Sequence, residues 1–242
     1  MSGLIYDLGE TREFAKKVLM KLQDDEVYIL FLNARKKWCP ELSRSEEILY
    51  RDVIRGNAID GTLRKIKKTS CVSGGIYVDR NTLKEIDFGC MALYILLDPR
   101  STLKGYGEFI ENINSWIYDS FKGETKNLEL YRKMDIKLFS AIHKNRSRGI
   151  FFVIDIDEKD ENTLDKITEQ LIGNIVWISE THGGYHVIVN RSYETGIIIY
   201  ENMADIKNVE ILKEPTTPIP GTLHGGFPVK GIRKGLWSEF NI

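Results

Sequence analysis

Two carboxylates close an apolar run in the second half of the chain. Residues 151–157 read Phe-Phe-Val-Ile-Asp-Ile-Asp. Side chains alternate faces in a strand, so Asp155 and Asp157 would share one face while Ile154 and Ile156 pack beneath. Like charges this close repel each other unless a cation neutralises them. The pattern therefore predicts either a Mg²⁺ or Mn²⁺ site for phosphoryl or nucleotidyl transfer, or simply a solvated strand end.

A glycine pair and a histidine follow this acidic strand. Gly183 and Gly184 form a turn between two apolar runs, and His186 stands near the start of the second run. Glycines let backbone N–H groups approach a phosphate closely, and an imidazole beside them can donate to the same anion. A predicted helix over Glu161–Leu171 separates this turn from the acidic strand. The arrangement favours a phosphate contact by His186, with a structural histidine as the alternative.

These motifs together resemble those of the archaeo-eukaryotic primase superfamily. Asp155-Ile156-Asp157 resembles its first acidic motif, and residues 183–187 are similar to its histidine motif. A third block, Pro218–Gly226, resembles the Leu-Pro-Gly-Ser-Leu-His-Gly segment of archaeal small primase subunits. In that family the histidine of this segment, here His224, contacts the triphosphate of the incoming nucleotide. The blocks occur in the family's order, and the resemblance covers roughly residues 148–231.

The resemblance implies a small primase-polymerase that joins nucleoside triphosphates on a DNA template. Asp155, Asp157 and a third acid would hold two Mg²⁺ or Mn²⁺ ions, which activate the 3′-hydroxyl and stabilise the leaving pyrophosphate. His186 and His224 would bind the triphosphate. Backbone approach would be allowed by Gly183, Gly184, Gly225 and Gly226. The implied partners are template or primer DNA and a helicase or other replication proteins; the motifs do not decide between ribo- and deoxyribonucleotides.

The third metal-binding acid has several candidates. A strand predicted over residues 208–214 would place Glu210 and Glu214 on one face. Glu214 is the first choice because it directly precedes the proline-rich approach to the His224 loop. Glu210 is the second choice because it follows a hydrophobic residue, as the family's motif does. Asp205 is the third choice, favoured by its spacing from His224.

Basic residues that could contact phosphate come from separate parts of the chain. The archaeal subunit has a lysine two residues after its second histidine, where this chain has Gly226, so that phosphate contact is either missing or supplied by Lys230. Arg146 and Arg148 lead into the acidic strand and are candidates for DNA binding. Arg100 is a third candidate in a turn after a buried strand, where Ser101 as a helix N-cap is the alternative. Two further basic runs either bind nucleic acid or form solvated faces: Arg35–Lys37 and Arg64–Lys68.

Length and composition favour a chain with a substantial core. The 242 residues are 42% hydrophobic and 10% aromatic, which excludes a disordered protein. A net charge of −1 does not suit a protein that coats nucleic acid, so DNA contacts would depend on local patches. The chain has no apolar run of membrane length and no basic secretory start, which predicts a cytoplasmic location. The three cysteines are too far apart for a local zinc site or a disulfide framework.

The elements that must position these residues follow from hydrophobic periodicity. Up to residue 147 the pattern predicts an α/β module. Its helices lie over 14–22, 109–121 and 131–142, and its strands over 27–33, 75–78 and 91–97. Ser43 and Glu46 form a capping box that predicts another helix. From residue 148 the order strand, helix, strand, glycine turn, strand predicts an RRM-like catalytic module. The expected fold class is α/β (α+β), with residues 1–147 packed on residues 148–242 in one compact unit.

Two other function classes fit the same residues. Acids and histidines on a sheet also cut phosphodiesters, which makes a metal-dependent nuclease the first alternative. A relaxase is disfavoured because His182 and His186 are four residues apart and do not flank one hydrophobic residue on a strand face. The second alternative is a non-catalytic relative that binds nucleic acid, which would not need intact acids.

Overall fold

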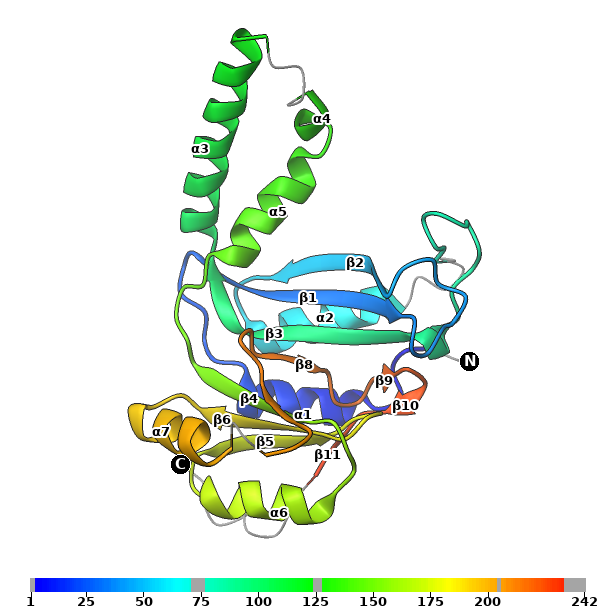
Figure 1. The fold of residues 1–242 in the computed structure, drawn as a ribbon, viewed down its shortest axis with the longest axis vertical. Coiled ribbons are helices and arrows are strands. Elements are labelled where there is room, and N and C mark those ends of the chain that lie inside the picture. The colour runs from blue at the N-terminus through cyan, green and yellow to red at the C-terminus, as the bar shows by residue number, and fades with distance from the viewer. Residues whose placement is uncertain (1–2, 71–76, 124–127, 204–205, 233–242) are drawn as a thin grey trace.

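Two antiparallel sheets face each other across helix α1 (Leu8–Val18), as Figure 1 shows. The computed structural model describes residues 3–70, 77–123, 128–203 and 206–232. The predicted strand over 75–78 lies partly outside these residues, and Val78 forms a single bridge with Glu85. The third-choice acid Asp205 lies outside them entirely.

The first sheet is built around the long strand β3. Its strand order is β10-β9-β3-β1-β2, and β8 also pairs with β3. The strands are β1 (Glu26–Arg35), β2 (Glu46–Ile54), β3 (Met91–Ser101), β8 (Thr216–Pro218), β9 (Leu223–His224) and β10 (Phe227–Pro228). Leu30, Leu32 and Ala34 of β1 enter the core beside α1, so the residues between them face the other side of the sheet.

The helix predicted after Ser43 is wrong, because residues 46–54 form strand β2. They pair with β1 along nearly its whole length, from Tyr28 to Arg35. Ile48, Tyr50, Val53 and Ile54 suit a pleated, half-buried surface, and sheet pairing overrides a local capping pattern. The Ser43 backbone N–H instead donates to the Asp79 carboxylate at 2.8 Å.

The second sheet has the topology expected of an RRM-like module. Its strand order is β11-β5-β6-β4-β7. The strands are β4 (Phe151–Ile156), β5 (Ile175–Glu180), β6 (Tyr185–Asn190), β7 (Val209–Ile211) and β11 (Lys230–Gly231). Helices α6 (Glu161–Gln170) and α7 (Tyr193–Asn202) connect β4 to β5 and β6 to β7, which gives the order βαββαβ. The expected mixed α/β class is therefore confirmed.

The two faces of the second sheet pack against different layers. Ile154, Ile156 and Val187 contact the outer layer formed by α6 and α7. Phe151 and Val153, which alternate with them on β4, join the core around α1. Phe14 of α1 meets the ring of Trp177 on β5 edge to face, with centroids 5.5 Å apart. Helix α1 therefore packs between the two sheets and contributes to a core that both of them share.

The two modules are interleaved along the chain. After β7 the chain crosses to the first sheet as β8, β9 and β10, and then returns to pair Lys230 of β11 with Glu180 of β5. Helix α2 (Ala58–Ser70) and the short 3-10 helix η1 (Phe88–Cys90) complete the body around the first sheet. The expected division between residues 147 and 148 stays a prediction.

A helical projection rises from the body between β3 and β4 (Figure 1), and the end of its last helix reaches the first sheet, where Arg51 of β2 lies over Phe139. It consists of α3 (Thr102–Phe121), α4 (Leu128–Tyr131) and α5 (Met134–Lys144). Ser101 caps α3 by accepting the Lys104 backbone N–H at 3.1 Å, which confirms the helix start considered for this turn. Within the described part of the chain, no helix is both long enough and apolar enough to cross a membrane.

We expect the base of this projection to depend on Gly105. A Cβ at this position would lie 2.7 Å from the Cα of Ile142 on α5, whereas a Cβ at Gly107 would meet nothing within 4 Å. Gly105→Ala should destabilise the protein by about 1–3 kcal/mol through overpacking. The control Gly107→Ala should stabilise it by about 0.5–1 kcal/mol, because alanine favours helix. Urea unfolding of both variants measures the difference, and equal stability of the two would contradict this packing.

Candidate active site

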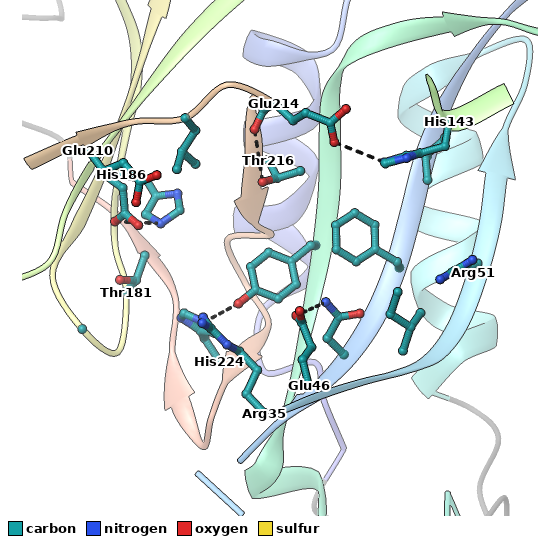
Figure 2. A pocket seen from close by; sticks show the side chains of 18 of the residues that line it. Arg35, Glu46, Arg51, His143, Thr181, His186, Glu210, Glu214, Thr216 and His224 are labelled. Carbon is teal, nitrogen blue, oxygen red and sulfur yellow. Dashed lines mark hydrogen bonds and ion pairs between the residues drawn. The ribbon is translucent and has the colours of Figure 1, made fainter. Parts of the chain in front are cut away.

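A cavity of about 600 Å³ opens between the two sheets (Figure 2). One wall comes from the first sheet and includes Arg35, Tyr94 and His224. The opposite wall comes from the second sheet and includes Asp155 and Glu210. Helix α5 closes one end with Phe139, Ser140 and His143. The predicted metal ligands Asp155 and Glu210 thus face His224 and the side chains of β1 across one space.

The acidic wall is fixed by strand register. Asp155 lies directly opposite Glu210 of β7 on one side and His186 of β6 on the other. Side chains of directly paired residues have Cβ atoms about 4.5–5.5 Å apart on the same face. Asp157 follows the end of β4, where its backbone N–H donates to the Asn208 carbonyl at 2.8 Å. The cavity is lined by Asp155, Asp157, His186 and Glu210.

Asp155 and His186 form a close pair. The His186 Nε2 atom lies 3.2 Å from the Asp155 Oδ1 atom. Burial opposes ionisation of Asp155, but the hydrogen bond and charge of His186, with Lys37 and Arg35, outweigh burial and lower its pKa. The carboxylate is therefore charged at neutral pH. The other ring nitrogen of His186, Nδ1, is buried without a hydrogen-bond partner in the described residues.

The wall formed by the first sheet carries basic side chains around a buried, neutral histidine, His224. His224 is buried, its Nε2 lies 2.8 Å from the Tyr94 hydroxyl, and its ring meets Trp38 edge to face at 4.5 Å. Burial, with a smaller contribution from His186, Lys37 and Arg35, lowers the pKa of His224 to about 2. His224 would thus meet a phosphate as a neutral imidazole. The positive charge on this wall comes from Arg35 and Lys37, which belong to one of the basic runs noted in the sequence.

Glu214 lies apart from the other acids. Strand β7 ends at Ile211, so the predicted strand through residue 214 is wrong. Beyond it the Pro215 carbonyl accepts the Leu97 backbone N–H at 2.8 Å, which turns the chain toward the first sheet. Glu214 is held by Arg100 at 3.2 Å and by His143 at 3.4 Å, at the far end of the cavity in Figure 2. Glu210, the second choice, is therefore the acid beside Asp155.

The arginines predicted to bind DNA all form ion pairs with carboxylates of the protein. Arg100 is 1% exposed and its guanidinium contacts Glu214. Arg146 pairs with the buried Asp98 at 3.2 Å, and Arg148 pairs with the buried Glu26 at 3.0 Å. Buried carboxylates need such partners, and Arg146 and Arg148 supply them while staying partly exposed. Burial corrects the expectation of a DNA contact for Arg100, and the other two are engaged in internal pairs.

The glycines of the two histidine motifs differ in what they permit. A Cβ on Gly184 would lie 1.8 Å from the Ile156 carbonyl oxygen, and one on Gly225 would lie 2.4 Å from the Trp38 ring. These two glycines therefore allow close packing within the protein. Gly183 lines the cavity, and a Cβ there would meet nothing within 4 Å, so its backbone is open to a ligand. Lys230 is on β11, opposite Glu180, and is not among the described residues that line the cavity.

The chain has no significant match among protein-family models, curated proteins or solved structures. Its function is therefore inferred from the residues and their geometry. Sequence reasoning missed Asn33, Tyr94 and His143 as cavity residues, and no local pattern distinguishes them from ordinary strand or helix residues. Their placement follows from sheet pairing and helix packing, which join segments far apart in the chain.

The acids have the donor chemistry of a divalent-cation site. Within the described residues, no three His, Cys, Asp or Glu side chains already converge as metal ligands. Asp155, Asp157 and Glu210 nevertheless open on one cavity and offer carboxylate oxygens, the ligands preferred by Mg²⁺ and Mn²⁺. The residues present therefore fit such ions in donor type.

We expect His224 to make the fold sensitive to acid. A histidine with a lowered folded-state pKa contributes stability that is complete above its unfolded value of about 6.5 and is lost as pH falls. Between pH 7.5 and 4.5 this loss should be about 2–3 kcal/mol for the wild type and absent in His224→Gln. Urea unfolding across this pH range measures both curves. His182→Gln, at an exposed neighbouring histidine, is the control; parallel curves for the wild type and His224→Gln would contradict burial of a neutral imidazole.

Proposed function

We propose that the protein is a metal-dependent nucleotidyltransferase of the primase-polymerase type, which adds nucleotides from triphosphates to a strand on a DNA template. The supporting observation is the register that places Glu210, Asp155 and His186 side by side on one sheet face. Across the same cavity stand Arg35 and Lys37, whose positive charges suit a triphosphate. The motif resemblance to archaeo-eukaryotic primases points to the same reaction.

Each wall of the cavity has its own role in this proposal. Asp155, Asp157 and Glu210 would hold the divalent ions, which when bound activate the attacking hydroxyl and stabilise the charge of the pyrophosphate. His186 holds Asp155 in position and keeps it ionised. Arg35 and Lys37 would orient the triphosphate opposite the acids. Glu214 is assigned a structural role and not a metal-binding one, because it already forms ion pairs with Arg100 and His143.

Template DNA would approach along the edge of the cavity beside α5. Arg51 is exposed, lines the cavity and lies over the Phe139 ring, with its guanidinium carbon 5.5 Å from the ring centroid. An arginine and an aromatic ring at a cavity edge suit a nucleic-acid strand. A helicase or another replication protein is the partner class that would supply single-stranded template. Cations at this edge would make template binding salt-dependent.

The decisive experiment compares two glutamates in a template-extension assay. Glu210→Gln should lower nucleotide incorporation by about a hundredfold or more, because loss of a metal ligand removes several kcal/mol of transition-state stabilisation. Glu214→Gln is the matched control and should retain most of the activity. Asp155→Asn with Asp157→Asn should abolish incorporation. Incorporation of labelled nucleotide is measured with Mn²⁺, with and without a primer, and thermal melting checks that each variant is folded.

The same assay separates the alternatives. A nuclease would shorten the labelled strand in the absence of triphosphates, and a non-catalytic binding protein would retain the strand unchanged. Full activity of Glu210→Gln together with loss in Glu214→Gln would reverse the assignment of the third acid. Near wild-type extension by the double aspartate variant would overturn the proposed reaction itself.

A further inference from the structure

Strand β1 presents a graded row of side chains to the cavity. Arg35, Asn33, Phe31 and Ile29 all line it, while the alternate residues of β1 are buried in the core on the opposite face. Neighbours in this row are about 6.8 Å apart along the strand. Along the row the chemistry changes from a cation to an amide, then to an aromatic ring and an aliphatic chain.

The cation marks the phosphate end of this row. Arg35 lies close enough to Asp155 and His224 for its charge to act on both, and it also interacts with the Tyr94 hydroxyl. These are the residues that face the proposed triphosphate position. A nucleotide bound there would extend from Arg35 along β1 toward Phe31.

The amide of Asn33 is the polar position in the middle of the row. Asn33 is 4% exposed, and its Nδ2 donates to the Glu46 Oε1 atom at 2.6 Å, the interaction drawn at Glu46 in Figure 2. A carboxylate accepts only, so this bond fixes the amide with its oxygen as the other group. Within the described residues that oxygen, Oδ1, has no hydrogen-bond partner. A buried acceptor left unpaired is costly, and a donor from a ligand would satisfy it.

The aromatic position lies one step further along β1. Phe31 and Tyr94 pair across β1 and β3 with nearly parallel rings, at a centroid distance of 5.5 Å and an interplanar angle of 16°. Nucleobases stack on aromatic surfaces of this kind with little dependence on sequence. The order along the wall, cation then acceptor then aromatic surface, matches the order of phosphate, sugar and base in a nucleotide.

We propose that the Asn33 Oδ1 atom accepts a hydrogen bond from a sugar hydroxyl of the bound nucleoside triphosphate, with the base against Phe31. This inference rests on the proposed function, because the row is oriented by its phosphate end. A phosphate is disfavoured at Asn33 itself, since the unpaired atom is an acceptor and the neighbouring Glu46 is an anion. Glu46 is a positioning residue that holds the amide in the orientation able to accept.

The test measures binding of four adenosine triphosphates that differ only in their sugar hydroxyls. They are ATP, its 2′-deoxy and 3′-deoxy forms, and the 2′,3′-dideoxy form, each titrated calorimetrically in Mg²⁺. The wild type should bind the dideoxy form about 3- to 10-fold more weakly than ATP, as expected for one neutral hydrogen bond. The two monodeoxy forms identify which hydroxyl is bound.

Two variants of neighbouring residues on β1 separate sugar recognition from general affinity. Asn33→Leu should bind all four triphosphates equally, because the acceptor is gone. Phe31→Leu should weaken all four by a similar factor and keep the hydroxyl preference. If thermal melting shows that Asn33→Leu does not fold, Asn33→Ala, which also lacks the acceptor, replaces it with the same expected loss.

The outcomes distinguish this inference from the proposed function. Equal binding of all four triphosphates by the wild type overturns the role of Asn33 and leaves the triphosphate site intact. A folded Asn33 variant that keeps the hydroxyl preference does the same. If the wild type binds none of the four, both the inference and the proposed function fail.

Discussion

The carboxylate of Asp98 joins the two sheets, and the position of the acidic wall depends on it. Asp98 is fully buried in β3, and its Oδ1 accepts the backbone N–H groups of Ile150 at 2.7 Å and Phe151 at 3.3 Å. Its Oδ2 pairs with Arg146 at 3.2 Å. A buried charge persists only when it is paired and hydrogen-bonded, and removing one partner costs about 3–5 kcal/mol. The first residues of β4 are thereby fixed at the end of β3, and Asp155 follows four residues later.

Opposite charges then face each other across a space that the fold holds open. Asp155, Asp157 and Glu210 project from one sheet, and Arg35 and Lys37 from the other. Burial removes the charge of His224 between them, so its ring packs beside Tyr94 and Trp38 without adding to the repulsion among the cations. A ligand that is anionic at one end and accompanied by divalent cations complements both walls together.

What the sequence predicts well is local. The alternation in residues 151–157 predicts the face of Asp155, because strand geometry has a period of two whatever lies around it. The choice between Glu210 and Glu214 depends on where β7 ends and the chain crosses to β3, which is a property of both sheets. The capping box at Ser43 fails for the same reason, since pairing with β1 decides the conformation of residues 46–54.

The sequence also does not show which residues form ion pairs when they lie far apart in the chain. Arg148 pairs with Glu26, 122 residues away, and Arg100 meets Glu214, 114 residues away. An arginine beside an acidic strand therefore has the same local signature whether it faces a nucleic acid or a buried carboxylate. No local sequence pattern marks Asn33 or Tyr94 as a cavity residue, because only the pairing of β1 with β3 brings them to the same cavity.

The helical projection leaves and re-enters the body at almost the same point. The Ser101 backbone N–H donates to the Asn145 carbonyl at 2.8 Å, and Arg100 forms a bridge with Arg146. For the pairing of the strands, helices α3 and α5 therefore connect β3 to β4 in the way that a closed turn would. Closing a longer loop adds only about 0.6 kcal/mol for each doubling of its length. The part of the projection beyond the cavity residues Phe139 and His143 can therefore change in size and shape during evolution while the body that bears the acids keeps its register.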